Sequence, residues 1–180
     1  HEIIMAHGAG LEDRMELTQT DGWNDDAVTR VSGLSYNYCG VIDLPEGCNV
    51  DATPAIGERL PDVEISAHVR LHHLTAHTRF TLFAVLDEFE GAQLEKSILA
   101  YAAIERNYPG IIRVELIAPS TPYPWPGLLP TADPDGLVGR ELNAAAGGEF
   151  ILVRPDGYIG CRVKIGSFEV LEDFLRTILL

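Results

Sequence analysis

One segment constrains the fold of this chain more than any other, the stretch from Gly148 to Val163. Two short β-prone runs, Phe150–Val153 and Tyr158–Val163, flank the tripeptide Pro155-Asp156-Gly157. Proline presets φ for a tight turn, and glycine accepts the positive φ that such a turn needs. The segment therefore predicts a β-hairpin, which any fold for this chain must accommodate.

The charged residues of this hairpin predict a structural site. Arg154 and Asp156 lie at the turn, and Arg162 returns on the second strand. One of the two arginines is expected to pair with the aspartate and fix the strand register. Charges at the end of a hairpin are usually solvated or locally paired. We therefore assign a structural and non-catalytic role to Arg154, Pro155, Asp156, Gly157 and Arg162.

From Gly57 onward the chain alternates strand and helix patterns, which predicts an α/β domain over residues 57–180. Phe80–Leu86 is a nearly continuous apolar run with the length of a buried central strand. Further strands are predicted at Val63–Ile65, Val69–Leu71 and Ile111–Ala118, and helices at Gln93–Asn107, Leu137–Ala146 and Phe168–Leu180. The order is βαβ followed by ββα, the last half being the hairpin and the final helix. This order indicates a thioredoxin-like fold, with a central mixed sheet flanked by helices.

Residues 1–56 have a different character from residues 57–180 and are assigned to a separate region. Leu11–Gln19 is compatible with a helix, and Val31–Tyr38 alternates like a strand. Residues 39–62 carry glycine, proline and aspartate without periodicity, which is typical of a long connection. Residue 1 is a histidine, so we interpret the sequence as a trimmed or processed piece of a longer chain.

Composition argues against several classes of partner. The formal net charge is −14 and the pI is near 4.7, so repulsion opposes binding to nucleic acid and to anionic membranes. No apolar run approaches the roughly 20 residues that span a bilayer. Three cysteines, Cys39, Cys48 and Cys161, form no Cys-X-X-Cys pair, which favours a reducing cytoplasm. Pairing of Cys39 with Cys48 in an oxidising compartment is the alternative.

The sequence carries no motif for catalysis or for binding a cofactor. A redox-active thioredoxin needs Cys-X-X-Cys at the start of the helix after the central strand. This chain has residues 87–91 there, which are largely acidic and include no cysteine. The GxGxxG, Walker and GxSxG patterns do not occur either. The sequence therefore argues against a thioredoxin-type redox centre and predicts no catalytic residue.

Two other clusters are candidates for binding. Tyr123 and Trp125 lie in a proline-rich loop that can present aromatic rings rigidly, so they form a possible interface. Such a loop more often packs onto its own domain. Four histidines form the densest group of metal-ligand residue types, but neighbouring arginines disfavour a cation and favour ordinary polar histidines. These histidines are His68, His72, His73 and His77.

Three segments carry a family resemblance. They are Val31–Tyr38, then Gly57–Asp62 with Leu71–Leu74 and Phe80–Leu86 downstream, and finally Leu152–Ile159 with Arg162. In this order they resemble the C-terminal part of the FAD-dependent aromatic hydroxylases, the phenol hydroxylase-like class A flavoprotein monooxygenases. The hairpin is the most specific, since it is similar to the family's LVRPDGYIAWR motif. Cys161 stands where that family often has tryptophan.

The resemblance implies a role within a larger enzyme. Family members use FAD and NAD(P)H to hydroxylate aromatic substrates, and their flavin motifs lie in an N-terminal portion that this sequence does not contain. Residues 1–56 would then be the end of the preceding flavin or substrate domain and a linker. Residues 57–180 would be the C-terminal domain, which lost its redox cysteines and serves packing on the flavin domain or homodimer contacts. No FAD-, NAD(P)H- or metal-binding residue carries over to this chain. The alternatives are a free-standing, redox-inactive thioredoxin-like module that binds a protein partner, and a stand-alone enzyme of unknown type.

Overall fold

The structure is a computed structural model that describes residues 43–66, 69–88, 91–120 and 130–179. The chain divides into two compact units, His1–Asn37 and Tyr38–Leu180, and every described residue lies in the second. The elements predicted at Leu11–Gln19 and Val31–Tyr38 fall outside the described residues. The same holds for Cys39, His68 and the loop that carries Tyr123 and Trp125. No helix in the described part of the chain is both long and apolar enough to cross a membrane.

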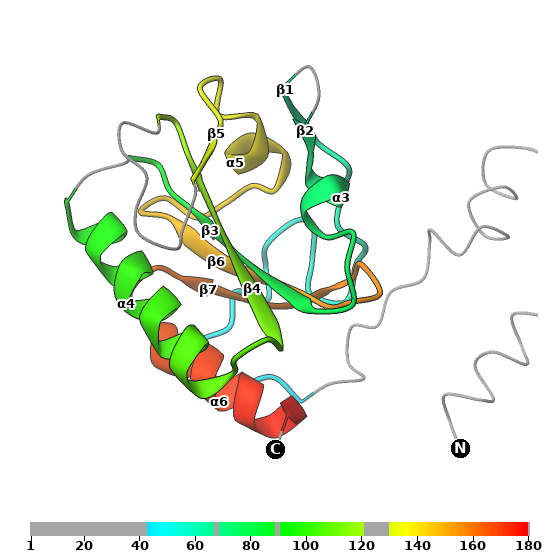
Figure 1. Cartoon of the computed structure of the whole chain (residues 1–180), viewed down its shortest axis with the longest axis vertical. Helices are drawn as coiled ribbons and strands as arrows, with labels where there is room; N and C mark the ends of the chain where they lie inside the picture. The colour runs from blue at the N-terminus through cyan, green and yellow to red at the C-terminus, as the bar shows by residue number, and fades with distance from the viewer. Residues whose placement is uncertain (1–42, 67–68, 89–90, 121–129, 180) are drawn as a thin grey trace, which may run out of the picture. The chain divides into compact units, whose positions relative to one another are not determined.

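A five-stranded mixed sheet forms the centre of the second unit (Figure 1). Its strand order is β5-β4-β3-β6-β7. β3 (Phe80–Val85) lies in the middle, parallel to β4 (Ile112–Ala118) and antiparallel to β6 (Glu149–Val153). β7 (Ile159–Lys164) pairs antiparallel with β6 and forms one edge. The predicted central strand and the predicted hairpin are both confirmed.

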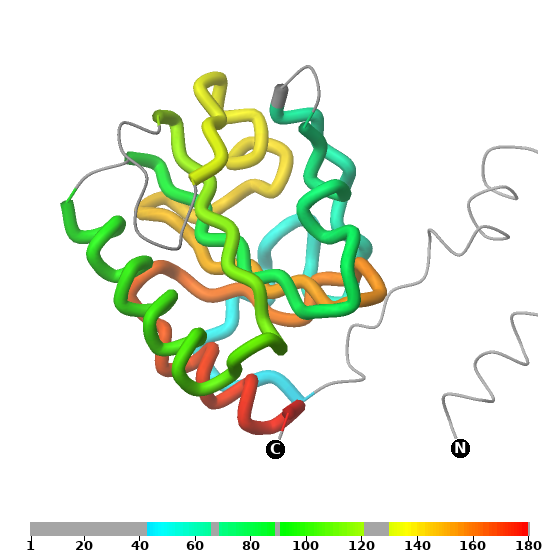
Figure 2. Tube along the Cα trace, viewed as in Figure 1, coloured from blue at the N-terminus to red at the C-terminus, as the bar shows by residue number. Residues whose placement is uncertain are grey.

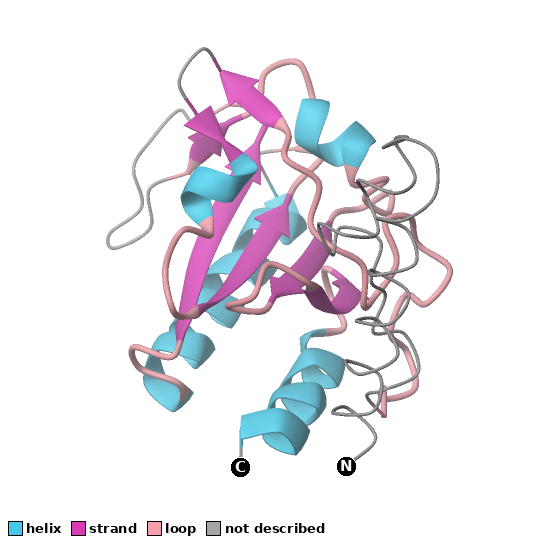
Figure 3. Cartoon of the chain, turned by 90° about the vertical axis from the view of Figure 1, so that its right-hand side faces the viewer, coloured by secondary structure: helices cyan, strands magenta, loops and turns pink. Residues whose placement is uncertain are grey.

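Helices cover both faces of this sheet because successive residues of its inner strands point in opposite directions. One face carries α4 (Gly91–Asn107) and α6 (Phe168–Leu179), whose apolar residues pack on Leu82, Leu116 and Phe150. Figure 3 gives the second view of these two long helices. The other face packs through Phe83 and Ile151 against three short elements. They are α3 (Leu71–Leu74), α5 (Leu137–Glu141), and the hairpin of β1 (Glu64–Ser66) with β2 (Val69–Arg70).

Two elements differ from the sequence prediction. The helix expected over Leu137–Ala146 ends at Glu141, because Asn143 adopts a φ of 45° and the next residues turn toward β6. A short strand, β5 (Thr131–Ala132), pairs in parallel with the end of β4 and was not predicted. Two residues give no alternation from which a strand can be recognised. Both differences lie in the connection that leads from β4 back to β6.

Residues 45–60, here called the edge segment, lie along the outer edge of β7 (cyan in Figure 2). The backbone N–H of Asn49 donates to the carbonyl of Arg162 at 2.8 Å, and that of Gly57 to the carbonyl of Ile159 at 2.8 Å. These bonds satisfy polar groups that an edge strand otherwise exposes. The segment buries the apolar side chains of Ala52, Ile56 and Leu60. Residues that the sequence assigns to a linker thus take part in the packing of the sheet domain.

Candidate functional site

The hairpin turn has the local ion pair that its sequence predicts, and Arg154 is the partner. Arg154 Nη2 lies 2.6 Å from Asp156 Oδ2, and the two side chains are 30% and 44% exposed. The turn is closed by the N–H of Gly157, which donates to the carbonyl of Arg154 at 2.9 Å. Gly157 adopts a φ of 84°, a backbone conformation that only glycine adopts without strain. An exposed pair of this kind adds at most about 1 kcal/mol, so its role is to fix the turn.

Arg162 has a different environment from the one expected, because its side chain is completely buried. It is 0% exposed, and so is its partner Glu149. Arg162 Nη2 lies 2.6 Å from Glu149 Oε2, and Arg162 Nε lies 3.3 Å from Oε1. The remaining donors reach the carbonyls of Pro54 at 2.6 Å and Leu142 at 2.7 Å. A buried arginine therefore satisfies acceptors from three separate parts of the chain.

The Glu149 carboxylate completes this network from the other side. It accepts hydrogen bonds from Asn49 Nδ2 at 2.8 Å and from the backbone N–H of Ala145 at 3.2 Å. Burial of both charges is tolerable because each has several hydrogen-bond partners. The Arg162–Glu149 pair thus joins β6, β7, the edge segment and the connection after α5. The sequence prediction of a solvated or locally paired Arg162 was wrong on this point.

The position where a redox-active thioredoxin has its cysteines carries acidic residues with structural contacts. Asp87 follows β3, and its Oδ2 accepts the N–H of Gly147 at 2.6 Å. Asp133 caps α5, accepting the N–H groups of Leu137 and Val138 at 2.9 and 2.8 Å. These two aspartates line a pocket of about 400 Å³ at the carboxyl ends of β3 and β4. Both carboxylates already bind backbone N–H groups of the chain.

The described residues around this pocket do not fit FAD. A dinucleotide is held where a glycine-rich turn presents backbone N–H groups to its pyrophosphate at the start of a helix. Here Asp87 and Glu88 precede α4, and their negative charges repel a pyrophosphate. The pattern GxGxxG is missing from the sequence as well. We therefore derive no chemical step through a flavin for this chain.

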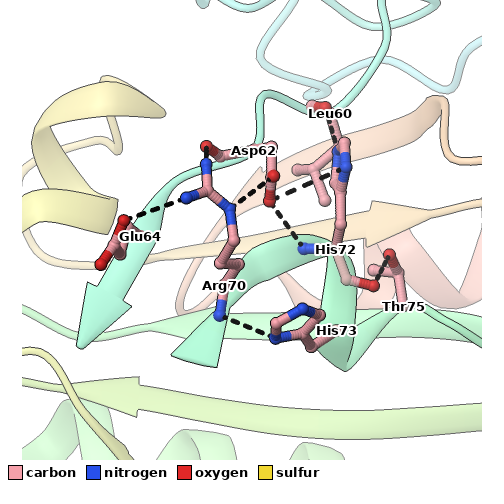
Figure 4. A network of polar contacts seen from close by, with 7 residues as sticks. All are labelled: Leu60, Asp62, Glu64, Arg70, His72, His73 and Thr75. Atoms are coloured by element: carbon pink, nitrogen blue, oxygen red, sulfur yellow. Dashed lines mark hydrogen bonds and ion pairs between the residues drawn. The ribbon is translucent and has the colours of Figure 1, made fainter. Parts of the chain in front are cut away.

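Two of the described histidines, His72 and His73, lie in a polar network at α3, which Figure 4 shows. His72 Nε2 lies 2.8 Å from the carbonyl of Leu60, and His73 Nδ1 accepts the N–H of Arg70 at 3.3 Å. Arg70 also bonds Asp62 at 2.6 Å and Glu64 at 3.0 Å. The helix ends at Leu74, so His73 and His77 do not share a helical face. Within the described ranges, no group of three or more His, Cys, Asp or Glu side chains is placed to hold a metal.

A second polar group lies on β4. Glu115 is buried and pairs with the half-exposed Arg113 two residues earlier. Burial raises the pKa of Glu115, and the nearby Arg113 offsets only part of that effect. The pKa of His77 is lowered by burial and by the charges of Arg79 and Arg113. No local pattern in the sequence marks Glu115 as buried, since acidic residues usually occupy the solvated face of a strand.

Two cysteines that are far apart in sequence meet at the outer sheet edge. Cys48 lies on the edge segment and Cys161 on β7, with their sulfur atoms 3.5 Å apart. Cys161 is fully buried and Cys48 is half-buried. The alternative partner considered from sequence, Cys39, lies outside the described residues. The spacing of 113 residues between Cys48 and Cys161 gives no sequence signal for this contact.

The sheet order and helix placement define the class of this domain as a thioredoxin-like α/β fold. A protein of Chlorobium tepidum described as a thiol:disulfide interchange protein DsbE superposes with a TM-score of 0.52 at 12% identity. That match covers 75% of this chain and 98% of the other. A thioredoxin-like protein of Parabacteroides distasonis gives 0.47 at 14% identity, over 72% and 99%. The first likeness supports the predicted fold, and at such low identity it shows the fold alone.

The sequence is similar to one curated enzyme over its whole length. It is 38% identical over 183 residues to pentachlorophenol 4-monooxygenase of Sphingobium chlorophenolicum. The match covers all of this chain and 33% of the relative, so the chain spans about a third of that enzyme's length. No protein-family model matches the chain. The match confirms the resemblance to the flavin-dependent aromatic hydroxylases and fits a C-terminal region of such an enzyme.

Proposed function

We propose that this chain is the C-terminal structural domain of an FAD- and NAD(P)H-dependent aromatic-ring monooxygenase and is not catalytic alone. The observation that carries the proposal is the similarity of the entire chain to one third of a monooxygenase. Its partners are then the flavin domain of the same protein and a second copy of the chain. The proposal includes a cytoplasmic location for the protein.

The contacts of the described residues support a structural role. The functional groups that are most buried, Arg162 and Glu149, bind each other and backbone groups of the chain. Asp87 and Asp133, which stand near the redox position of related folds, bind backbone N–H groups. Side chains committed to such internal bonds hold a scaffold together and are poorly placed for acid–base chemistry.

The first test is made on the purified chain and on the complete protein encoded by its gene. The proposal expects an upstream reading frame with a GxGxxG segment, a flavin spectrum for the complete protein, and none for residues 1–180. Stoichiometric flavin on the 180-residue chain alone would overturn it. A gene without an upstream flavin region, whose product binds another protein, would favour the free-standing module.

The second test addresses the homodimer. Tyr123 and Trp125 are the proposed contact residues, so a Tyr123→Ser/Trp125→Ser variant of the complete protein should dissociate in light scattering. Its flavin content and its turnover per bound flavin should stay at the wild-type level. The control is Leu99→Ser, an exposed apolar residue on α4 in the described part of the chain, which should leave the dimer intact. A wild-type protein that is monomeric at micromolar concentration would contradict the homodimer part of the proposal.

A further inference from the structure

The contact between Cys48 and Cys161 is held in place by the residues that follow each cysteine. The N–H of Asn49 donates to the carbonyl of Arg162 at 2.8 Å, so the two backbones run side by side at this point. The Asn49 side chain also bonds Glu149, which is the buried partner of Arg162. The sulfur atoms, 3.5 Å apart, are therefore positioned by a rigid hydrogen-bonded frame. A disulfide needs them to close to about 2.0 Å.

The two thiols differ in ways that assign separate roles to them. Cys48 is half-buried and reachable from solvent, whereas Cys161 is completely buried beneath it. The contact with Cys161 lowers the pKa of Cys48 against the opposing effect of burial. The same contact, together with burial, raises the pKa of Cys161. In thiol–disulfide exchange, the thiol that is reachable from solvent and has the lower pKa attacks the incoming disulfide, and its buried neighbour then resolves the mixed disulfide.

We propose that Cys48 and Cys161 are an oxidation site that forms an intramolecular disulfide by exchange with a low-molecular-weight disulfide of the glutathione type. The bond would fix the edge segment covalently to β7. The site lies at the outer sheet edge, away from the start of α4 where redox-active thioredoxins carry their cysteines. The inference stands on the contact between these two side chains and does not depend on the proposed monooxygenase role.

The chemistry balances as a two-step exchange. The Cys48 thiolate attacks one sulfur of oxidised glutathione, which forms a mixed disulfide and releases one glutathione thiolate. The Cys161 sulfur then attacks Cys48 Sγ, and the second glutathione leaves as a thiolate. The protons of the two cysteine thiols end on the two released glutathione molecules. The protein is oxidised by two electrons, and one oxidised glutathione is reduced to two thiols.

The test treats the folded 180-residue chain with excess oxidised glutathione, quenches with acid and digests with an endoprotease that cleaves after glutamate. Cleavage after glutamate places the three cysteines in separate peptides, 17–46, 47–58 and 150–169. Peptide mass spectrometry before and after reduction then identifies which cysteines are joined. The variants are Cys48→Ser and Cys161→Ala, with Cys39→Ser as the matched control, and circular dichroism verifies that each is folded.

The wild type and Cys39→Ser should both lose two thiols and yield peptide 47–58 linked to peptide 150–169. Cys48→Ser should lose this link completely. Cys161→Ala should retain one glutathionyl group on peptide 47–58, because the mixed disulfide has no resolving thiol. A link between peptides 17–46 and 47–58 would overturn the proposal. The proposal would also be overturned if the folded wild type accumulated the glutathione adduct, or if the disulfide formed only after unfolding in urea.

Discussion

Replacing Arg162 with methionine should destabilise the domain far more than the same change at Arg154, although both arginines belong to one hairpin. Arg162→Met removes a completely buried guanidinium that binds Glu149 and the carbonyls of Pro54 and Leu142. Methionine fills much of the volume of the arginine stem, so the change acts mainly through lost polar contacts. Arg154→Met removes a half-exposed pair with Asp156.

The expected size of the effect follows from the partners left behind. Removing one member of a buried ion pair costs about 3–5 kcal/mol, because the remaining charge is left uncompensated. The Glu149 carboxylate keeps two donors, Asn49 Nδ2 and the N–H of Ala145, which reduces its share of that cost. The carbonyls of Pro54 and Leu142 lose theirs, and each unsatisfied buried group costs about 1–3 kcal/mol. We therefore expect a loss of about 3–5 kcal/mol for Arg162→Met, against less than about 1 kcal/mol for Arg154→Met.

Urea unfolding followed by circular dichroism measures this difference. With a slope of about 2 kcal/mol per molar urea, Arg162→Met should lower the midpoint by about 2 M and Arg154→Met by less than about 0.5 M. A Glu149→Gln variant and the double variant Arg162→Met/Glu149→Gln complete a mutant cycle. The double variant should lose less unfolding free energy than the sum of the two single variants, because it has no unpaired buried charge at this site. Equal costs for Arg162→Met and Arg154→Met, or strict additivity in the cycle, would refute the reasoning.

Three further changes give outcomes with a definite sign. Burial by itself would raise the pKa of Asp62, but the hydrogen bonds from Arg70 and from the backbone of His72, together with the charges of these two residues, outweigh it and hold that pKa below 3.8. The stability that the Asp62 carboxylate contributes is therefore present above pH 3.8 and is lost as pH falls through the lowered pKa. Asp62→Asn should reduce this loss of stability when urea unfolding is measured at acid pH. Burial raises the pKa of Glu115 above 4.5. The contribution of this group to the stability of the fold is therefore fully present below pH 4.5 and is lost as pH rises through the raised pKa. Glu115→Gln should consequently unfold at a higher urea concentration than wild type at pH 7. The stabilities of the two proteins should become equal at about pH 4. A variant that is less stable than wild type at pH 7 would contradict this reasoning. Gly157→Ala should cost about 1–2 kcal/mol because of its φ of 84° in open space, whereas Gly139→Ala within α5 should be neutral or stabilising.

The parts of the fold that sequence predicted are those with their own periodic pattern. β3, α4 and α6 follow long apolar periodicities, and the hairpin follows from turn chemistry, so each is encoded within one segment. α5 was expected to be longer because residues 144–146 are alanines, which favour helix. Tertiary demands override this preference, since the chain must turn at residues 147 and 148 to enter β6 beside β3.

The two sites found in the structure could not be located in the same way. The Arg162–Glu149 network needs the register of β6 and β7 together with the approach of Asn49 and Pro54. One signal was available, because a charged residue within strands that are otherwise apolar on both faces requires a buried partner. The identity of that partner depends on how the strands pair, so it cannot be inferred from the sequence of either strand alone. The Cys48–Cys161 contact depends on the same docking of the edge segment, so the sequence offers no clue to it.

The docking of the edge segment also has a consequence for the order in which the domain is made. Pro54 is synthesised early, but the arginine that binds its carbonyl is 108 residues further along the chain. Until β6 and β7 emerge, the apolar side chains of Ile56 and Leu60 lack part of the cluster that buries them in the finished protein. Contacts of such long sequence separation slow folding and prolong the exposure of apolar segments. During translation the nascent domain therefore carries an incompletely docked apolar segment until β7 has been made, and such segments are the kind that chaperones bind.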